Sequence, residues 1–340
     1  MLRVPYDDLF GALLLAMLRL GLGGERAAVC AQLFAETTRD GVYTHGLNRF
    51  PRFVETIANG SVDVNAEPVK AAGFGAIERW DGRRGVGNLT ALMCMDRAIA
   101  LAREHGIGGV ALANTNHWMR GGSYGWHAAE QGLFALCWTN TLANLPAWGA
   151  TTPVLGNNPL VIAVPRPGGH VVLDMAMSQF SYGAISAYSK RGELLPVDGG
   201  FDTAGNLTRD AAAIETSQRA LPIGYWKGSG LSLVLDMVAA MLSGGLATHE
   251  IPRESTRETG VSQIFLAIDP GNLIESKEMI RIAEGILESL REATPVDPNK
   301  PVRYPGEETL RLREENMRLG IPVDPEVWDL LKSYAAPTPK

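Results

Sequence analysis

The sequence predicts an α/β protein with one main core and a smaller helical lobe. Its 340 residues exceed the usual length of a single domain, yet no low-complexity segment separates two independent units. Hydrophobic residues make up 46% of the chain and charged residues 20%, a balance that is typical of a globular protein with a large core. After Ala76, short β-rich runs alternate with helical patterns, which indicates an α/β core.

The first part of the chain predicts helices. Two stretches with helical patterns, Asp7–Leu20 and Glu25–Thr38, are separated by Gly21–Gly24, where glycine can adopt the left-handed conformation that ends a helix. A third helical stretch covers Arg49–Ala58. The apolar run Leu9–Leu22 follows two acidic residues rather than a basic segment, so we expect a buried helix there and not a signal peptide.

The middle of the chain carries strand patterns, and helical patterns dominate again near its end. The expected strands are Val110–Asn114, Phe134–Asn140, Leu160–Val164, Val171–Met175 and Ile264–Ile268. The expected helices are Asn88–His105, Leu231–Leu242, Ser276–Arg291 and Glu308–Leu319. Because Leu231–Leu242 is apolar nearly all round, we expect this helix to be buried, and it is too short to span a bilayer.

These patterns suggest an order of domains along the chain. We expect residues 1–72 to form the N-terminal helical lobe and residues 73–290 to form the α/β core that binds cofactor and substrate. Residues 291–340 should form a helical segment that rejoins the N-terminal lobe.

Charge and cysteine content exclude several functions. The formal net charge is −6 and no basic cluster is present, so no nucleic-acid partner is expected. The cysteines Cys30, Cys94 and Cys137 have neither the spacing of metal ligands nor that of a disulfide framework. We therefore expect no metal site, and a reducing cytoplasm fits this cysteine usage best.

The chain lacks the usual glycine motif of dinucleotide-binding proteins. The nearest match, Gly106–Ala111, follows a helical pattern and begins a strand, whereas the Rossmann motif follows a strand and begins a helix. No P-loop is present either. A nicotinamide cofactor would have to bind in another way.

A better candidate for an anion site is the segment Tyr225–Gly230. It is expected to lead into the helix beginning near Leu231, where free N–H groups favour phosphate, and Lys227 adds a positive charge. An ordinary glycine-rich turn with a solvated lysine explains the segment equally well.

The polar segment Thr38–Arg49 contains a candidate proton-transfer residue. A histidine such as His45 ordinarily has a pKa near neutrality, which suits it to proton transfer, although a histidine in a loop can also serve only hydrogen bonding. Pro51 indicates that the next helix begins near Asn48, which leaves His45 in the preceding loop. Whether His45 lies on the helix or in the loop before it, the chain can bring His45 and Arg49 together.

Further polar residues lie where strands end. His117 is in the segment Asn114–Ser123 between a strand and a helix, where it could orient a substrate or bond only to its own loop. Asn157 and Asn158 are typical of a turn. Asp174 interrupts an apolar strand and needs a partner, which could be a backbone turn, a cation or a ribose hydroxyl.

Taken together, these motifs resemble those of the type 2 malate/L-lactate dehydrogenases. The likeness extends from about Val4 to Trp328 and is carried by strings such as GVYTHGLNRFPRF, NHWMRGGSYGW, LPVDGGFD and GYWKGSG. The matching stretches are Arg39–Arg49, Asn114–Gly125, Gly156–Pro159, Leu173–Gly183, Leu195–Asn206 and Gly224–Met237. The resemblance implies a three-layer α/β core with a mixed sheet that is not a Rossmann fold, and a homodimer.

The resemblance also implies roles for individual residues. His45 is expected to be the proton donor. From the chemistry of a ketone beside a carboxylate, we expect Arg49 to hold the substrate carboxylate, with His117 as a candidate second substrate contact. The expected cofactor contacts are His170, Val171, Val172, Leu173, Asp174, Met175 and Ala176, then Trp226 and Lys227, then Gly306, Glu307 and Glu308.

The expected reaction is the reduction of a ketone beside a carboxylate. Hydride transfer from NADH builds negative charge on the ketone oxygen, which an imidazolium at His45 can neutralise by donating a proton. NADH is favoured over NADPH because a carboxylate of Glu307 or Glu308 can accept a hydrogen bond from a ribose hydroxyl but repels a phosphate. Alternatively, both glutamates simply begin the helix Glu308–Leu319.

Two other readings remain open. The substrate could be another small 2-oxo or 2-hydroxy acid, such as malate, lactate or ureidoglycolate, or a cyclic imino acid, since pocket shape decides this choice. A catalytically silent binding protein is the second class. The presence of His45, Arg49, His117 and Lys227 together argues against it.

Overall fold

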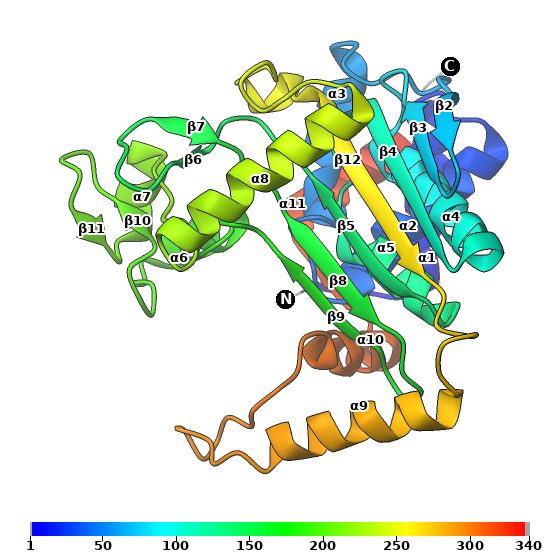
Figure 1. Ribbon diagram of the computed structural model, residues 1–340. Coiled ribbons are helices and arrows are strands. Elements are labelled where there is room, and N and C mark those ends of the chain that lie inside the picture. Colours follow the sequence, from blue (N-terminus) through cyan, green and yellow to red (C-terminus); the bar gives the residue numbers. More distant parts are fainter. Residues whose placement is uncertain (1, 337–340) are drawn as a thin grey trace.

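The computed structural model describes residues 2–336 and confirms the predicted α/β class (Figure 1). Its centre is a seven-stranded sheet in which β3 and β4 are parallel, while the other neighbouring strands are antiparallel. In spatial order the strands are β2 (Val69–Phe74), β3 (Ile77–Asp81), β4 (Ile107–Asn116), β12 (Thr259–Ile268), β5 (Phe134–Thr139), β8 (Leu160–Val164) and β9 (Val171–Met175). This mixed sheet differs from the largely parallel sheet of a Rossmann fold.

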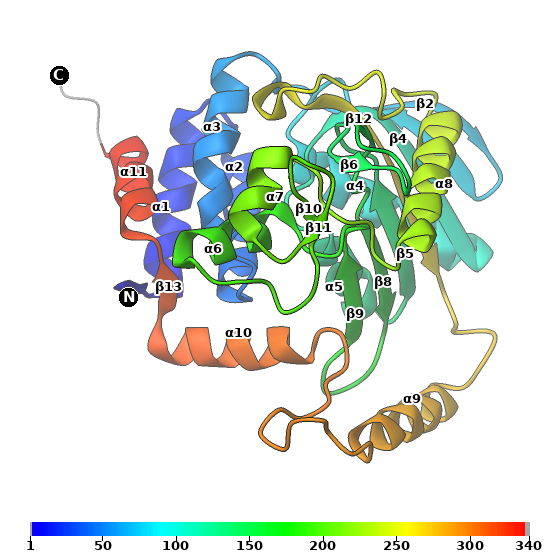
Figure 2. The ribbon, with the colours of Figure 1, turned by 90° about the vertical axis from the view of Figure 1, so that its left-hand side faces the viewer.

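Helices cover both faces of the sheet and give three layers (Figures 1 and 2). On one face lie α4 (Gly87–His105) and α5 (Gly122–Glu130), and on the other lies α8 (Trp226–Ser243). Side chains alternate accordingly along β4, because Leu112 packs into the core with α4 whereas Ala111 packs into the core with α8. The predicted three-layer arrangement is therefore confirmed.

The two ends of the chain meet in the helical lobe. Strand β1 (Leu2–Val4) pairs with β13 (Ile321–Val323), and the fully buried Leu13 and Leu331 belong to one apolar core. The helices of this part are α1 (Tyr6–Arg19), α2 (Gly24–Arg39), α3 (Phe50–Ala58), α10 (Glu307–Leu319) and α11 (Pro325–Ala335).

A second small lobe, on the left of Figure 1, was not predicted from the sequence. It is built mostly from very short elements, and the Ser181 hydroxyl and Asp210 carboxylate cap its two helices. Its elements are β6 (Leu145–Pro146), β7 (Pro153–Leu155), α6 (Tyr182–Arg191), β10 (Gly200–Phe201), β11 (Leu207–Thr208) and α7 (Ala211–Ser217).

Helix α9 (Ser276–Arg291) has the predicted bounds and lies apart from the sheet, at the bottom of both views (Figures 1 and 2). One contact to the body is the ion pair of 2.7 Å between Glu284 and Arg166. Leu287 is buried, whereas Ile286 is 64% exposed. Part of the apolar face of α9 is therefore uncovered in a single chain.

The expectation that Leu231–Leu242 is buried all round was wrong. Leu235 and Ala239 pack towards the sheet, but Met237 is 50% and Met241 75% exposed. The sheet covers one side of α8 only, so an apolar outer face remains open. No helix within residues 2–336 combines the length and hydropathy needed to cross a bilayer.

Candidate active site

A cavity of about 630 Å³ lies where the helical lobe, the sheet and the small lobe meet. His45 and Arg49 reach it from the segment between α2 and α3, His117 from the end of β4, and Asp174 from β9. The structure thus brings together four predicted site residues from three segments that are far apart in the sequence.

The position of His45 is set by a tightly packed turn after α2. The hydroxyl of Thr38 accepts a hydrogen bond from the Leu47 N–H at 2.9 Å and donates to the Phe34 carbonyl at 2.7 Å. A Cβ on Gly46 would lie 2.4 Å from that hydroxyl, so the turn requires glycine. His45 precedes the 3₁₀ turn Leu47–Arg49, which confirms its predicted place in the loop.

The two histidines of the cavity lie face to face. Their ring centroids are 5.9 Å apart and their planes differ by 19°. The Met119 N–H donates to Nδ1 of His117 at 3.0 Å, so the neutral ring carries its proton on Nε2. His117 therefore bonds to its own loop and still has one nitrogen available to donate to a ligand.

The protein surroundings of His45 favour its neutral form. Burial and the positive charges of Arg49 and Arg120 lower the pKa of His45 to about 4. The pKa of His117 is also lowered well below its usual value, chiefly by burial. A bound carboxylate would offset the arginine charges and raise the affinity of His45 for a proton.

Arg49 is placed to bind an anion. Its nearest carboxylate oxygen, Oε2 of Glu258, is 4.0 Å away, which is longer than a hydrogen bond. Burial lowers the pKa of Arg49 to about 10, so it remains positively charged at neutral pH. Its forked donors can therefore hold a substrate carboxylate in a defined orientation.

Asp174 finds a backbone partner. Its Oδ2 accepts a hydrogen bond of 2.8 Å from the Gly122 N–H at the start of α5. Of the partners considered from the sequence, the backbone turn is the one observed, and the carboxylate still lines the cavity.

The two asparagines before β8 differ in role. Asn158 is fully buried and links Thr141 to Ser232, with hydrogen bonds of 3.0 Å to the Thr141 N–H and 2.9 Å to the Ser232 carbonyl. Its role is structural. Asn157 lines the cavity and accepts a hydrogen bond from the Thr141 hydroxyl at 3.0 Å.

The expected cofactor segments lie along the edge strand β9. At its start, the Val172 N–H donates to the Pro305 carbonyl at 2.9 Å. Gly306 has a φ of +99°, and a Cβ there would lie 3.2 Å from the His170 carbonyl oxygen. At the other end of β9, the Ile223 N–H donates to the Met177 carbonyl at 2.9 Å, which places the start of α8 there. The three expected segments thus lie along one strand.

The predicted anion site at Tyr225–Gly230 needs correction. Helix α8 already begins at Trp226 and not near Leu231. The N–H groups of Lys227 and Gly228 donate to the carbonyls of Gly224 and Ile223, at 3.2 and 2.8 Å, and are not free for a phosphate. The exposed side chain of Lys227 remains as a possible anion contact, while Trp226 is 65% exposed.

Glu307 and Glu308 begin helix α10, as the alternative reading suggested. Oε1 of Glu308 lies 2.6 Å from Arg311, and its other oxygen pairs with Arg303. Glu307 lies 3.3 Å from Arg291. Both carboxylates are therefore engaged with arginines beside Gly306.

Several charged residues of the cavity were not recognised in the sequence. They are Arg52, Arg120 and Glu258. Arg120 could have been found, since it lies in the same loop as His117. Glu258 could not, because only the fold brings it to Arg49.

No group of three or more potential metal ligands occurs in the part of the chain that the structure describes. Cys30, Cys94 and Cys137 are free and buried.

Comparison with known proteins identifies the class to which this fold and cavity belong. The family model described as malate/L-lactate dehydrogenase matches residues 4–332. The chain belongs to this family of oxidoreductases.

Among curated relatives, the 2,3-diketo-L-gulonate reductases of Citrobacter koseri and Klebsiella pneumoniae are 49% and 50% identical to the chain over 327 residues. Each alignment covers 96% of this chain and 98% of the relative.

Solved structures agree with the fold. Malate dehydrogenase from Pyrococcus horikoshii has a TM-score of 0.89 and 27% identity, covering 98% of this chain and 94% of that one. The Δ1-piperideine-2-carboxylate reductase from Pseudomonas syringae has a TM-score of 0.88 and 29% identity, covering 98% and 100%.

Proposed function

We propose that this chain catalyses the NADH-dependent reduction of the C2 ketone of 2,3-diketo-L-gulonate to 3-keto-L-gulonate. The observation that carries the reaction type is the convergence of His45, Arg49 and His117 on one cavity. The substrate follows from the reductases that share about half of the sequence over nearly the full chain.

The residues along β9 fit a nicotinamide dinucleotide. When bound, this cofactor supplies the hydride. His170–Ala176 would hold it with Trp226, Lys227, Gly306, Glu307 and Glu308. Gly306 brings its segment closer to the backbone at the start of β9 than a residue with a Cβ could. Asp174 and Ala176 line the cavity itself, which connects this strand to the reaction centre.

The side chains of the cavity have separate roles in binding the substrate and in proton transfer. Arg49 binds the substrate carboxylate and thereby fixes which face of the ketone is presented. His45 donates the proton to the ketone oxygen after the bound carboxylate has raised its proton affinity. The Nε2–H of His117 provides a second hydrogen bond to substrate.

The test is a spectrophotometric screen of NADH oxidation. The panel contains 2,3-diketo-L-gulonate, the 2-oxo acids related to malate, lactate and ureidoglycolate, and a cyclic imino acid of the piperideine-carboxylate type. We expect the highest kcat/KM for 2,3-diketo-L-gulonate. Preference for another member of the panel would replace the substrate, and no turnover of any would favour a silent binding protein.

The preference for NADH is a separate prediction. We expect a higher kcat/KM with NADH than with NADPH, and we expect Glu307→Ala or Glu308→Ala to reduce that preference if the carboxylate contacts the ribose. The kcat/KM values with NADH and with NADPH are measured on the same substrate. A parent enzyme that prefers NADPH would contradict the proposal, and the arginines around Glu308 would then be the phosphate contacts.

The open apolar faces of α8 and α9 support a homodimer. We expect sedimentation to give about twice the chain mass of 36.6 kDa. Met241→Lys places a charge on the outer face of α8, where the side chain is 75% exposed, and should shift the protein towards monomer. A parent protein that is monomeric at working concentration would contradict this proposal.

We place the enzyme in the cytoplasm, in line with its free cysteines.

A further inference from the structure

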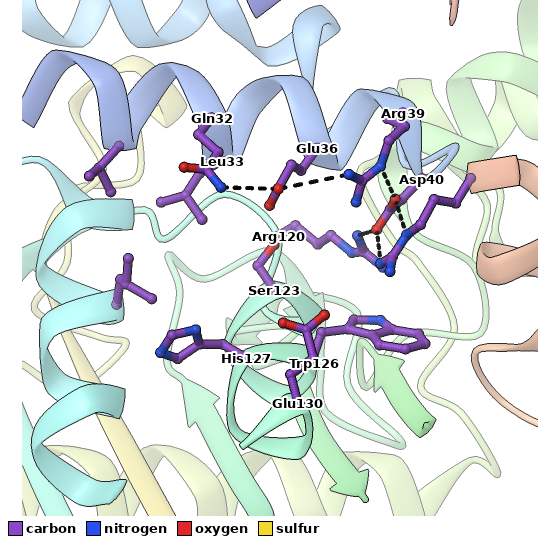
Figure 3. Close-up of a pocket in the computed structure, with 13 residues that line it drawn as sticks. Gln32, Leu33, Glu36, Arg39, Asp40, Arg120, Ser123, Trp126, His127 and Glu130 are labelled. Carbon is purple, nitrogen blue, oxygen red and sulfur yellow. Dashed lines mark hydrogen bonds and ion pairs between the residues drawn. The ribbon is translucent and has the colours of Figure 1, made fainter. Parts of the chain in front are cut away.

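A second cavity of about 370 Å³ lies beside the active site, between α2 and α5 (Figure 3). Arg120 lines both this cavity and the active-site cavity, so it forms part of the wall between them. Its side chain runs towards Asp40, and the two residues are only 6% and 3% exposed. Buried charges of this kind are kept because they are paired or have a function.

Asp40 is paired with three arginines. It accepts a hydrogen bond from Nη1 of Arg120 at 2.8 Å, two from Arg313 at 2.9 and 2.8 Å, and one from Arg39 at 2.9 Å. Although burial raises its pKa, these arginines hold the pKa of Asp40 at about 2. Asp40 therefore stays ionised and fixes Arg120.

Part of the Arg120 guanidinium group has no protein partner. Its Nε is buried and donates to no acceptor within residues 2–336. A Cβ built on Gly122 would lie 3.3 Å from this Nε and 2.8 Å from Oδ2 of Asp174, so the Nε lies towards the carboxylate that lines the active site. An unpaired buried donor is costly, and a ligand oxygen that reached this Nε would supply the missing acceptor.

Arg120 also lies near the reacting group. The positive charges of Arg49 and Arg120 both act on the imidazole of His45. Since Arg49 holds the carboxylate at C1 and His45 serves the oxygen at C2, the next oxygen of a 2,3-dioxo acid is the carbonyl at C3. It is the remaining acceptor adjacent to the ketone.

We propose that Arg120, fixed by Asp40, donates to the C3 oxygen and thereby selects 2,3-dioxo acids over 2-oxo acids that lack an oxygen at C3. This inference rests on the proposed function and adds the residue that determines substrate choice. If Arg120 instead contacted the C2 oxygen or the cofactor, its substitution would change different kinetic quantities.

The experiment compares kcat/KM for 2,3-diketo-L-gulonate with that for the 3-deoxy-2-oxo acid of the same chain length. The parent should prefer the dioxo acid, and Arg120→Gln should lower the ratio about 10- to 100-fold, the usual value of one charge-assisted hydrogen bond. Arg120→Lys retains a charge beside Asp40 and should lower the ratio by a smaller factor. It serves as the second variant if Arg120→Gln fails to fold.

Arg313→Gln is the matched control, because Arg313 also pairs with Asp40 but does not line the active-site cavity. Its ratio should stay within about twofold of the parent's, well below the loss expected for a charge-assisted hydrogen bond. An equal loss for both substrates in Arg120→Gln would overturn the proposal, as would an equal change of ratio in Arg313→Gln. A weaker affinity of Arg120→Gln for NADH in a fluorescence titration, together with an unchanged ratio of kcat/KM values, would also overturn the proposal. If the parent reduces neither substrate, the proposed function itself fails.

Discussion

Replacing His45 with Gln should lower kcat by about two to four orders of magnitude. Glutamine retains polar contacts in the turn but cannot deliver a proton to the ketone oxygen. Binding of NADH should remain nearly unchanged, because the expected cofactor segments lie along β9 and not in this turn. Steady-state kinetics and a fluorescence titration of NADH measure the two quantities.

The same variant should remove a pH dependence. Because the pKa of His45 in the free enzyme is about 4, kcat/KM for reduction should fall as the pH rises above that value and the proton is lost. The reverse oxidation needs the neutral imidazole, so its rate should instead hold above this pH. His105→Gln, at the exposed end of α4, is the control that should keep both profiles. Near-normal turnover in His45→Gln would remove this residue from the mechanism.

Replacing Arg49 with Lys should raise KM for the carboxylate substrate by about 10- to 100-fold. Lysine keeps the charge but loses the forked donors, and a hydrogen bond to a charged group is worth about 1.5–3 kcal/mol. The effect on kcat should be smaller, because the proton donor is intact.

Arg257→Lys provides the matched control, since this arginine is exposed. Its KM should equal that of the parent. An unchanged KM in Arg49→Lys would mean that another cation, such as Arg52, holds the carboxylate.

Local patterns predicted the regular elements well. Strands β8 and β9 and helix α9 have the predicted bounds, because the apolar run of each strand and the helical periodicity of α9 end clearly in the sequence. The place of His45 before the next helix followed from Pro51, which fixes where a helix can begin.

These local sequence patterns could not predict tertiary contacts. The apolar sequence of α8 could not show that only one side of the helix meets the sheet. The pairs Arg49–Glu258 and Asp40–Arg313 join residues that are hundreds of positions apart, and no spacing rule connects them. The short elements around α6 carry too few residues for a periodic signal.

The most direct test of the proposed reaction follows the hydride itself. The enzyme is incubated with 2,3-diketo-L-gulonate and NADH that carries deuterium in place of the transferred hydrogen, and the product is examined by NMR. We predict one deuterium at C2 and a ketone retained at C3. Deuterium at C3, with the C2 ketone retained, would contradict the reduction of the C2 ketone in the cavity of His45 and Arg49.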